Sequence, residues 1–188
     1  MKITNSNISF QKTLIAKTQV LENNQPKQAF IYKLDRPDEY YYFEKAVQKQ
    51  PDWKNADLIY SIKEDVKKYD DDIFVLEDEE QNCLGYVSTI DYFDYDFKER
   101  NTFVIKLETM PKYAGRSTDK KIKHVGKALV AFLENLKCKK EKRGLHVTAP
   151  APDALDFYFK QGFEGSWDEG LIMQKPNREE QVKINFVS

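Results

Sequence analysis

The sequence predicts a single domain of the α/β or α+β type, and three observations support this prediction. Segments patterned like strands and segments spaced like helices follow one another in the order β-β-α-α-β-β-β-α-β-α-β, without an internal repeat. The chain has 188 residues, within the usual size of one domain with its own core. Its residues are 40% hydrophobic and 32% charged, which fits a soluble globular protein and argues against long disorder.

Two strands and then two helices are expected at the N-terminal end. Segments 14–21 and 28–35 flank a polar stretch, which predicts a hairpin whose loop contains Pro26. Segment 36–50 has a proline near its first helical position and apolar residues near helical spacing, which favours a helix. Segment 56–69 places its apolar residues on one face and predicts an amphipathic helix.

The centre of the chain predicts three more strands followed by a helix. Segments 73–78 and 83–93 are joined by a short polar turn, and 102–110 is rich in β-branched and aromatic residues. In segment 121–137 the apolar residues lie on one face, which has to pack against a sheet or another helix. These residues are Val125, Leu129, Phe132, Leu133 and Leu136.

Three elements are expected after this helix. Segment 144–150 predicts a strand, and 152–161 predicts a helix that Gly162 caps at its C-terminus. Segment 170–175 predicts a closing strand. Residues 1–13 and 177–188 are assigned to tails or edge strands.

The sequence gives no sign of a membrane segment, an export signal or a metal site. No stretch approaches the roughly 18 apolar residues that a spanning helix needs, and the N-terminus has no long apolar run. Cys83 and Cys138 lack the spacing of a zinc site, which predicts reduced thiols in a cytoplasmic protein. The two histidines, His124 and His146, fall in different elements, so no metal is expected.

Charge is unevenly distributed along the chain, although the formal net charge is only −1. Residues 69–97 contain many acidic and no basic residues, whereas Lys and Arg dominate 112–143. Two solvated faces of opposite sign would explain this pattern, and so would an anionic ligand on one side with a cationic one on the other. Nucleic acid is not an expected partner, because the net charge and the lack of a recognised motif count against it.

The start of the helix predicted in 121–137 gathers like charges. Its expected first turn contains Lys121, Lys123, His124 and Lys127. Each cation at this positive end of the helix dipole is unfavourable by about 0.3–1 kcal/mol. An anion bound to the free N–H groups would turn this repulsion into attraction, and Gly126 would let it approach the backbone. The alternative is a longer helix capped by Ser117 or Thr118, with the lysines solvated.

Three segments resemble, in this order and spacing, the motifs of the GNAT superfamily of N-acetyltransferases. They are LETMPKY at 107–113, KIKHVGKAL at 121–129 and ALDFYFKQGF at 154–163. The resemblance implies a GNAT-like acetyltransferase domain at 28–175, an N-terminal tail and extra strand at 1–27, and a C-terminal tail or edge strand at 176–188. It also implies a mixed, strongly twisted sheet with helices on both faces.

The resemblance implies transfer of an acetyl group from acetyl-CoA to an amine by direct attack, without a covalent enzyme intermediate. The start of the helix would bind the pyrophosphate, and the end of strand 102–110 would hold the thioester carbonyl and pantetheine. The residues implied to contact acetyl-CoA are Thr109, Met110, Lys121, Ile122, Lys123, His124, Val125, Gly126, Lys127 and Ala128.

Two side chains are candidates for proton transfer. Tyr158 matches the family tyrosine that acts as general acid, and the alternative is an ordinary half-buried aromatic residue. Glu108 is the candidate general base by its location, although it could face either side of the strand. Three acidic residues among aromatic ones could attract a cationic amine, or could form a solvated strand end. They are Asp91, Asp94 and Asp96.

The sequence departs from the family pattern at three positions. His124 stands in place of the first Gly of the turn, and Lys121 in place of an Arg or Gln. Ala151 stands where the family has an Asn that contacts the cofactor. These departures support a second reading, a catalytically inactive GNAT-like module that binds acyl-CoA or a partner. The identity of the amine, the acyl chain and the choice between monomer and homodimer stay open.

Overall fold

The fold is seen in a computed structural model. It describes residues 12–34, 42, 45, 72–95, 98–110, 122–147, 150, 152–166, 170–173 and 182–187. The helices predicted in 36–50 and 56–69 lie outside these residues, apart from Tyr42 and Lys45, which are helical.

The first two strands form the predicted hairpin, with a tighter turn than expected. β1 (Lys12–Glu22) and β2 (Gln25–Leu34) pair antiparallel along their length. The turn consists of Asn23 and Asn24, which both have positive φ angles, 51° and 63°. Because asparagine tolerates this left-handed conformation, two residues suffice to reverse the chain. The placement of Pro26 in the loop was wrong, since it is paired inside β2.

The described strands form one ten-stranded sheet. Its order is β10-β1-β2-β3-β4-β5-β7-β9-β8, and β6 also pairs with β1. β5 and β7 are parallel, and the other described pairs are antiparallel, so the prediction of a mixed sheet is confirmed. The remaining strands are β3 (Asp72–Asp78), β4 (Cys83–Asp94), β5 (Glu99–Thr109), β6 (Ile122–Lys123), β7 (Gly144–Val147), β8 (Glu164–Ser166), β9 (Gly170–Met173) and β10 (Asn185–Phe186).

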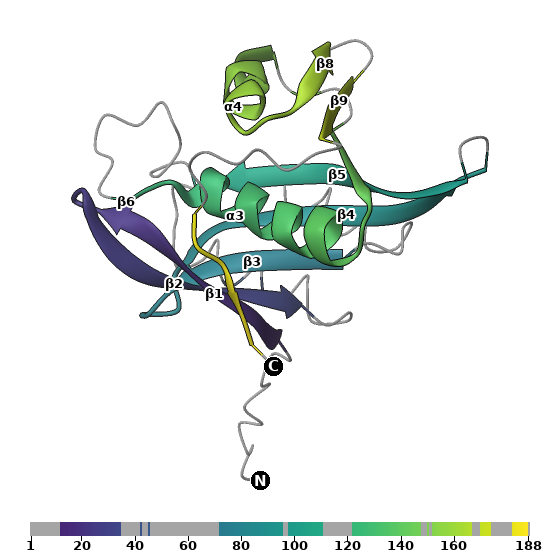
Figure 1. The fold of residues 1–188 in the computed structure, drawn as a ribbon. Coiled ribbons are helices and arrows are strands. Elements are labelled where there is room, and N and C mark those ends of the chain that lie inside the picture. The colour runs from purple at the N-terminus through teal and green to yellow at the C-terminus, as the bar shows by residue number, and fades with distance from the viewer. Residues whose placement is uncertain are drawn as a thin grey trace, which may run out of the picture.

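One long helix lies across one face of the sheet, where it contacts β1, β4 and β5 (Figure 1). It consists of α3 (Val125–Leu133) and a π-helical continuation, η2 (Glu134–Lys140). The apolar face predicted for it packs on the sheet: Leu129 and Phe132 are fully buried, and the Phe132 ring lies edge-on to Phe74, with ring centroids 5.0 Å apart. That helices cover both faces stays a prediction.

The helix begins at Val125, so the predicted start at residue 121 was wrong. Ile122 and Lys123 form β6, which pairs with the outer edge of β1. Their backbone groups thus find partners in the sheet instead of in a helical turn. His124, with φ of 69°, separates the strand from the helix. The longer helix considered as an alternative is excluded for the same reason.

The last predicted helix and its cap are confirmed. A short 3-10 turn, η3 (Pro152–Ala154), leads into α4 (Leu155–Lys160). Gly162 follows with a φ of 88°, and the N–H of Phe163 donates to the carbonyl of Tyr158 at 3.2 Å. This pattern is typical of a glycine C-cap.

The sheet extends beyond the expected domain limits. The boundary at 27/28 falls inside β2, and β10 lies beyond residue 175 but pairs with β1. Phe186 of β10 packs on Phe132, with ring centroids 6.0 Å apart. Both terminal strands therefore contribute to the same sheet and core.

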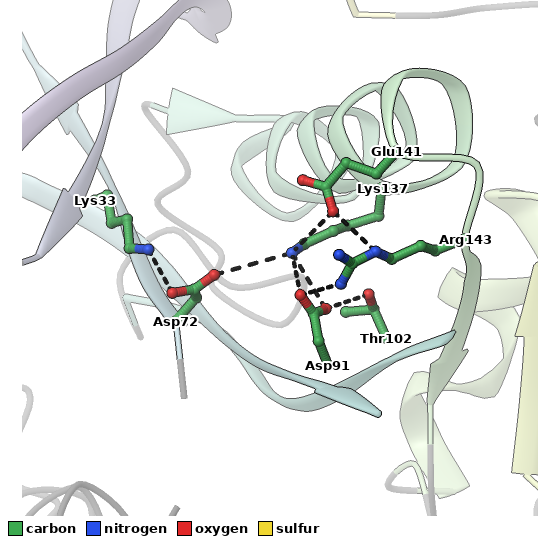
Figure 2. Close-up of polar contacts among 7 residues, drawn as sticks. All are labelled: Lys33, Asp72, Asp91, Thr102, Lys137, Glu141 and Arg143. Carbon is green, nitrogen blue, oxygen red and sulfur yellow. Dashed lines mark hydrogen bonds and ion pairs between the residues drawn. The ribbon is translucent and has the colours of Figure 1, made fainter. Parts of the chain in front are cut away.

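A charged network ties the end of the long helix to the sheet (Figure 2). The ammonium of Lys137, which is almost fully buried, lies 3.1 Å from Oδ2 of Asp91 on β4. Asp91 also pairs with Arg143 and accepts a hydrogen bond from the Thr102 hydroxyl at 2.5 Å. Glu141 contacts both cations, at 3.6 Å and 3.1 Å. The network thus holds the C-terminal end of the helix against β4.

Candidate functional site

The candidate site lies where β5 and β7 part. Their parallel pairing ends at Val104 and Val147, whereas β5 continues to Thr109. The β4–β5 ladder shifts register at this point and leaves Ile105 without a partner in β4. Such a β-bulge bends a strand and re-aims the residues that follow. Within the described residues, the end of β5 therefore has β4 on one side and no paired strand on the other, and we call this break in the ladder the opening.

The backbone of β5 presents alternate residues to this opening. Met110 donates its N–H to the carbonyl of Leu84 on β4, at 2.9 Å. Because peptide groups alternate along an antiparallel strand, the N–H and C=O groups of Thr109 and Leu107 point the other way, to the opening. Thr109 thus stays a candidate for holding the thioester carbonyl, while the N–H of Met110 is engaged in the sheet. Leu107 was missed in the sequence, although strand alternation could have indicated it.

α3 begins beside this opening without a side-chain cap. The first hydrogen bond within the helix runs from the N–H of Ala128 to the carbonyl of His124, at 2.9 Å. The N–H groups of Val125 and Gly126 precede it, and an α-helix supplies no acceptor for such groups from its own backbone. Together with the positive end of the helix dipole, they form an arrangement suited to an anion.

His124 occupies a backbone conformation that favours glycine. Its φ and ψ are 69° and 15°, and its side chain is exposed. A side chain in this left-handed region costs roughly 1–2 kcal/mol. Glycine adopts this conformation without strain, which gives a physical reason for the glycine that the GNAT motif has at the position of His124.

Replacing His124 by glycine is expected to raise the free energy of unfolding by up to about 1 kcal/mol. The gain comes from relieved strain, partly offset by the greater freedom of glycine in the unfolded chain. Denaturation by urea would measure it. His124→Ala removes the same imidazole but keeps the strain, so an alanine variant at least as stable as the glycine variant would contradict this explanation.

An aromatic ring fills the space beside Gly126. A Cβ atom at this position would lie 3.2 Å from Cζ of Phe157 on α4 and 3.5 Å from Cγ2 of Thr109 on β5. Close packing of α3 against Phe157 therefore favours glycine here, because the ring would have to move by a few tenths of an ångström to admit a Cβ atom. Its contact with a pyrophosphate stays a prediction. Phe157 was missed in the sequence, although it lies inside the third motif.

The other residues predicted to contact acetyl-CoA differ in what they can offer. Three of them have side chains in the hydrophobic core, so only their backbone groups could contact a ligand. They are Ile122, Val125 and Ala128. Lys123 donates to Oδ1 of Asn24 in the β1–β2 turn at 2.8 Å. Lys127 is half-buried in the first turn of α3, and Lys121 lies outside the described residues.

Tyr158 lies in an aromatic group on α4. Its buried ring packs edge-on to Phe157 and Phe163, with centroids 5.2 Å and 5.4 Å away. Burial raises the pKa of Tyr158 to about 12, so its hydroxyl keeps its proton at physiological pH. The structure thus shows the Tyr158 ring packed among other aromatic rings. Its role as general acid stays a prediction.

Glu108 faces away from α3. The Thr109 side chain points toward Gly126 of α3, so the preceding residue of the strand points to the opposite face. There Glu108 lies directly opposite Tyr86 of β4. Burial raises the pKa of Glu108, while the nearby Lys106 ammonium and the Tyr86 hydroxyl oppose the rise. A carboxylate with a raised pKa is better suited to accept a proton.

Asp91 does not serve as a free acidic group for an amine. Burial acts to raise its pKa, but the hydrogen bond from Thr102 and the charges of Lys137 and Arg143 hold it below the ordinary value. The carboxylate is thus committed to the network at the end of the helix. Asp96 and the side chain of Asp94 lie outside the described residues.

Both cysteines are buried free thiols, as predicted. Burial raises the pKa of Cys83 to about 12 and that of Cys138 to about 11. In the part of the chain that the structure describes, no cluster of His, Cys, Asp and Glu could hold a metal ion. No helix in that part has the length and apolar character needed to cross a membrane.

Comparison with solved structures identifies the fold. The chain is similar to the ribosomal-protein-alanine N-acetyltransferase from Brucella melitensis biovar Abortus 2308, with a TM-score of 0.53, 17% identity, and coverage of 74% of this chain and 94% of that one. An aminoglycoside acetyltransferase from an uncultured soil metagenomic sample gives a TM-score of 0.53 at 12% identity, over 73% and 93% of the two chains.

A third similar structure is the GCN5-related glucosamine N-acetyltransferase region of a fungal multi-domain β-N-acetylglucosaminidase. Its TM-score is 0.55 at 14% identity, over 74% of this chain and 17% of that one. No protein-family model matches the sequence, and no curated protein matches it. The chain has the fold of the GNAT N-acetyltransferases, so the fold that its motifs predicted is confirmed.

Proposed function

We propose that the protein is an N-acetyltransferase that transfers the acetyl group of acetyl-CoA to a primary amine by direct attack. The observation that carries this proposal is the opening between β5 and β7, which lies beside the uncapped start of α3. The similarity of the fold to acetyltransferases supports it.

The residues around the opening fit this co-substrate, which would supply an activated acetyl group as a thioester. The backbone N–H groups at the start of α3 and the ammonium of Lys127 suit the pyrophosphate. The outward peptide groups of Thr109 and Leu107 suit the amides of pantetheine, as an added strand would pair with a free edge. Phe157, against Gly126, would line this path.

Two groups would manage the protons. An alkyl ammonium has a pKa near 10.4, so a carboxylate has to remove a proton before the nitrogen can attack. Glu108 would do so from the face away from α3. Tyr158 would donate a proton to the departing thiolate from the wall formed by α4.

The acceptor class is proposed from the names of the similar structures. The names of the similar structures give a ribosomal-protein alanine, glucosamine and an aminoglycoside as acceptors, which all carry amines. We propose a primary amine here too. A cationic one gains no support from Asp91, whose charge is neutralised. We further propose a cytoplasmic protein, monomeric or homodimeric, whose acetyltransferase motifs lie within 28–175 and whose sheet is extended by the two terminal strands.

Charge reversal at Lys127 tests the anion site. We expect Lys127→Glu to weaken acetyl-CoA binding at least about tenfold, because it places a negative charge in the first helical turn. Isothermal titration calorimetry with acetyl-CoA measures this. Lys160→Glu, on the exposed end of α4, is the matched control and should bind like the wild type. A wild type that does not bind, or equal binding by Lys127→Glu, would refute the anion site.

A second candidate function is a GNAT-fold module that binds acyl-CoA or a partner without catalysis. His124 favours it, because its imidazole stands at the start of α3 where the family has glycine. The two functions differ in thiol release from acetyl-CoA with four amines: an alanine-terminated peptide, Nα-acetyl-lysine amide, glucosamine and kanamycin. Binding of acetyl-CoA without thiol release above the rate of spontaneous hydrolysis would favour the module.

A further inference from the structure

A buried carboxylate on β3 joins two residues that are distant from it in the sequence. Glu77 is only 1% exposed. Its Oε1 accepts a hydrogen bond from the Tyr42 hydroxyl at 2.5 Å, and its Oε2 lies 2.5 Å from Nζ of Lys12 at the start of β1. The Lys12 ammonium also lies over the Tyr32 ring, 4.3 Å from its centroid. We call Lys12, Glu77 and Tyr42 the Glu77 cluster.

The contacts of this carboxylate satisfy its buried charge. A buried carboxylate is costly unless a cation and hydrogen-bond donors lie close to it. Lys12 supplies the charge, and Tyr42 supplies the second donor. Burial raises the pKa of Tyr42 well above its ordinary value, so its hydroxyl stays a donor at neutral pH. Because a hydrogen bond to a charged group is stronger than one between neutral groups, Glu77 fixes the position of Tyr42.

The Glu77 cluster lies on the same face of the sheet as Glu108. Leu76 belongs to the core that α3 covers, so Glu77, the next residue of the strand, faces the other way. Val75 shares the face of Glu77. Directly opposite residues of an antiparallel ladder share a face, and this series runs from Val75 through Tyr86 to Glu108. The cluster is thus on the face from which Glu108 would act.

The cluster also lies at the end of the sheet where β5 stops. Glu77 pairs with Cys83, the first residue of β4. The next residue of β4, Leu84, accepts the hydrogen bond from Met110, which directly follows β5. Glu77 and the end of β5 are therefore at the same level of the sheet. They are two strands apart, which corresponds to roughly 10 Å.

We propose that Glu77 is a positioning residue that holds Tyr42 beside the path of the acceptor amine. This inference rests on the proposed function, in which the amine reaches Glu108 on the face away from α3. Acetyl-CoA would contact α3 on the other face. The cluster should therefore affect the affinity for the amine and leave the affinity for acetyl-CoA unchanged. Glu77 itself takes no part in proton transfer, because both of its oxygens are engaged and buried.

Tyr42→Phe keeps the ring and removes the hydroxyl that Glu77 holds. The kinetics use acetyl-CoA and whichever of the four amines above supports turnover. We expect KM for the amine to rise about tenfold, because the loss of a hydrogen bond to a charged group usually costs about that factor or more. The kcat and the KM for acetyl-CoA should stay unchanged. Calorimetry with acetyl-CoA should give the wild-type affinity, which also shows that the variant is folded.

Tyr32→Phe is the matched control. It removes a hydroxyl from a tyrosine beside the cluster, but it keeps the ring next to Lys12 and both contacts of Glu77. The KM for the amine should therefore equal that of the wild type. An equal rise of this KM in both variants overturns the inference, since the contact with Glu77 would then not be its cause.

Amide hydrogen exchange tests the position of Tyr42 without any turnover. The peptide that contains Tyr42 and Lys45 should exchange faster in Tyr42→Phe than in wild type. Equal exchange overturns the inference, because Tyr42 would then be held without Glu77. So does faster exchange with an unchanged KM for the amine, and wild-type turnover then keeps the proposed function intact. If the wild type acetylates none of the four amines, the proposed function fails and the inference fails with it.

Discussion

Asp91→Asn should lower the free energy of unfolding by about 2 kcal/mol. Removing one partner of a buried ion pair costs about 3–5 kcal/mol, and the 37% exposure of the Asp91 side chain reduces this figure. The substitution removes the carboxylate that is nearest to the ammonium of Lys137, whose side chain is only 3% exposed. Its remaining carboxylates are farther away, Glu141 at 3.6 Å and Asp72 at 3.9 Å. Urea denaturation at neutral pH would measure the effect.

Two further variants test whether the network around Asp91 stabilises the protein more than an ordinary exposed ion pair does. Lys33→Met removes an ion pair with Asp72 whose partners are 39% and 33% exposed, and should cost less than about 1 kcal/mol. Lys137→Met added to Asp91→Asn should restore part of the lost stability, because the uncompensated ammonium is gone. An Asp91→Asn effect no larger than that of Lys33→Met would rule out a stabilising network.

The same network should respond to acid. The pKa of Asp91 is held below its ordinary value, so its contribution is fully present above the unfolded-state pKa of about 3.9. It is lost as the pH falls through the lower pKa of the folded protein. The stability difference between wild type and Asp91→Asn should therefore be smaller at pH 3 than at pH 7.

The elements that the sequence predicted are those with a local pattern. The apolar stripe of the long helix repeats within a few residues, and Gly162 directly follows the helix that it caps. Strands such as β3 and β5 are rich in β-branched and aromatic residues, which predict strands. Each of these signals is read within one turn or one strand, which is why they were predicted correctly.

The start of α3 was mispredicted because its cause is remote in the sequence. Ile122 and Lys123 leave the helical pattern only because the outer edge of β1 accepts them as a short strand. Lys137 likewise looked like a solvated lysine, but its partner Asp91 comes from another element of the sheet. The π-helical winding of η2 had no evident signal in the sequence either.

Only part of the candidate site could be predicted, again because some of its neighbours are distant in the sequence. The motifs located Gly126, which lies beside Thr109 at the end of β5, and Tyr158, which lies in the core. The face on which Glu108 lies could not be predicted, because the bulge at Ile105 changes the alternation of β5. The position of Tyr86 opposite Glu108 follows only from the register of two neighbouring strands.

Tyr158→Phe is expected to lower kcat for acetyl transfer by at least about 100-fold, the usual contribution of a general acid. The ring packing against Phe157 and Phe163 survives the change, so the fold and the affinity for acetyl-CoA should be kept. Thiol release under saturating acetyl-CoA would give kcat, and calorimetry would give the affinity. Tyr95→Phe, at an 83% exposed position, makes the same chemical change as a control.

The acidity of Tyr158 decides whether this role is reasonable. Against a thiol in water, with a pKa of about 8.5, a phenol with a pKa of about 12 would be a poor donor. Burial disfavours a thiolate as well, so a thiolate that departs inside the site would be more basic than one in water. This difference makes proton donation by Tyr158 less unfavourable than the comparison in water indicates.

One outcome would reject the acid role. Undiminished kcat in Tyr158→Phe would leave the tyrosine with packing alone. The pH profile tests the protonation state of the hydroxyl, because a group with a pKa of about 12 stays protonated throughout a measurement between pH 6 and pH 10. We therefore expect no loss of wild-type activity in this range that Tyr158→Phe abolishes. Such a loss would show that Tyr158 titrates below this value and would leave its role as the acid in place.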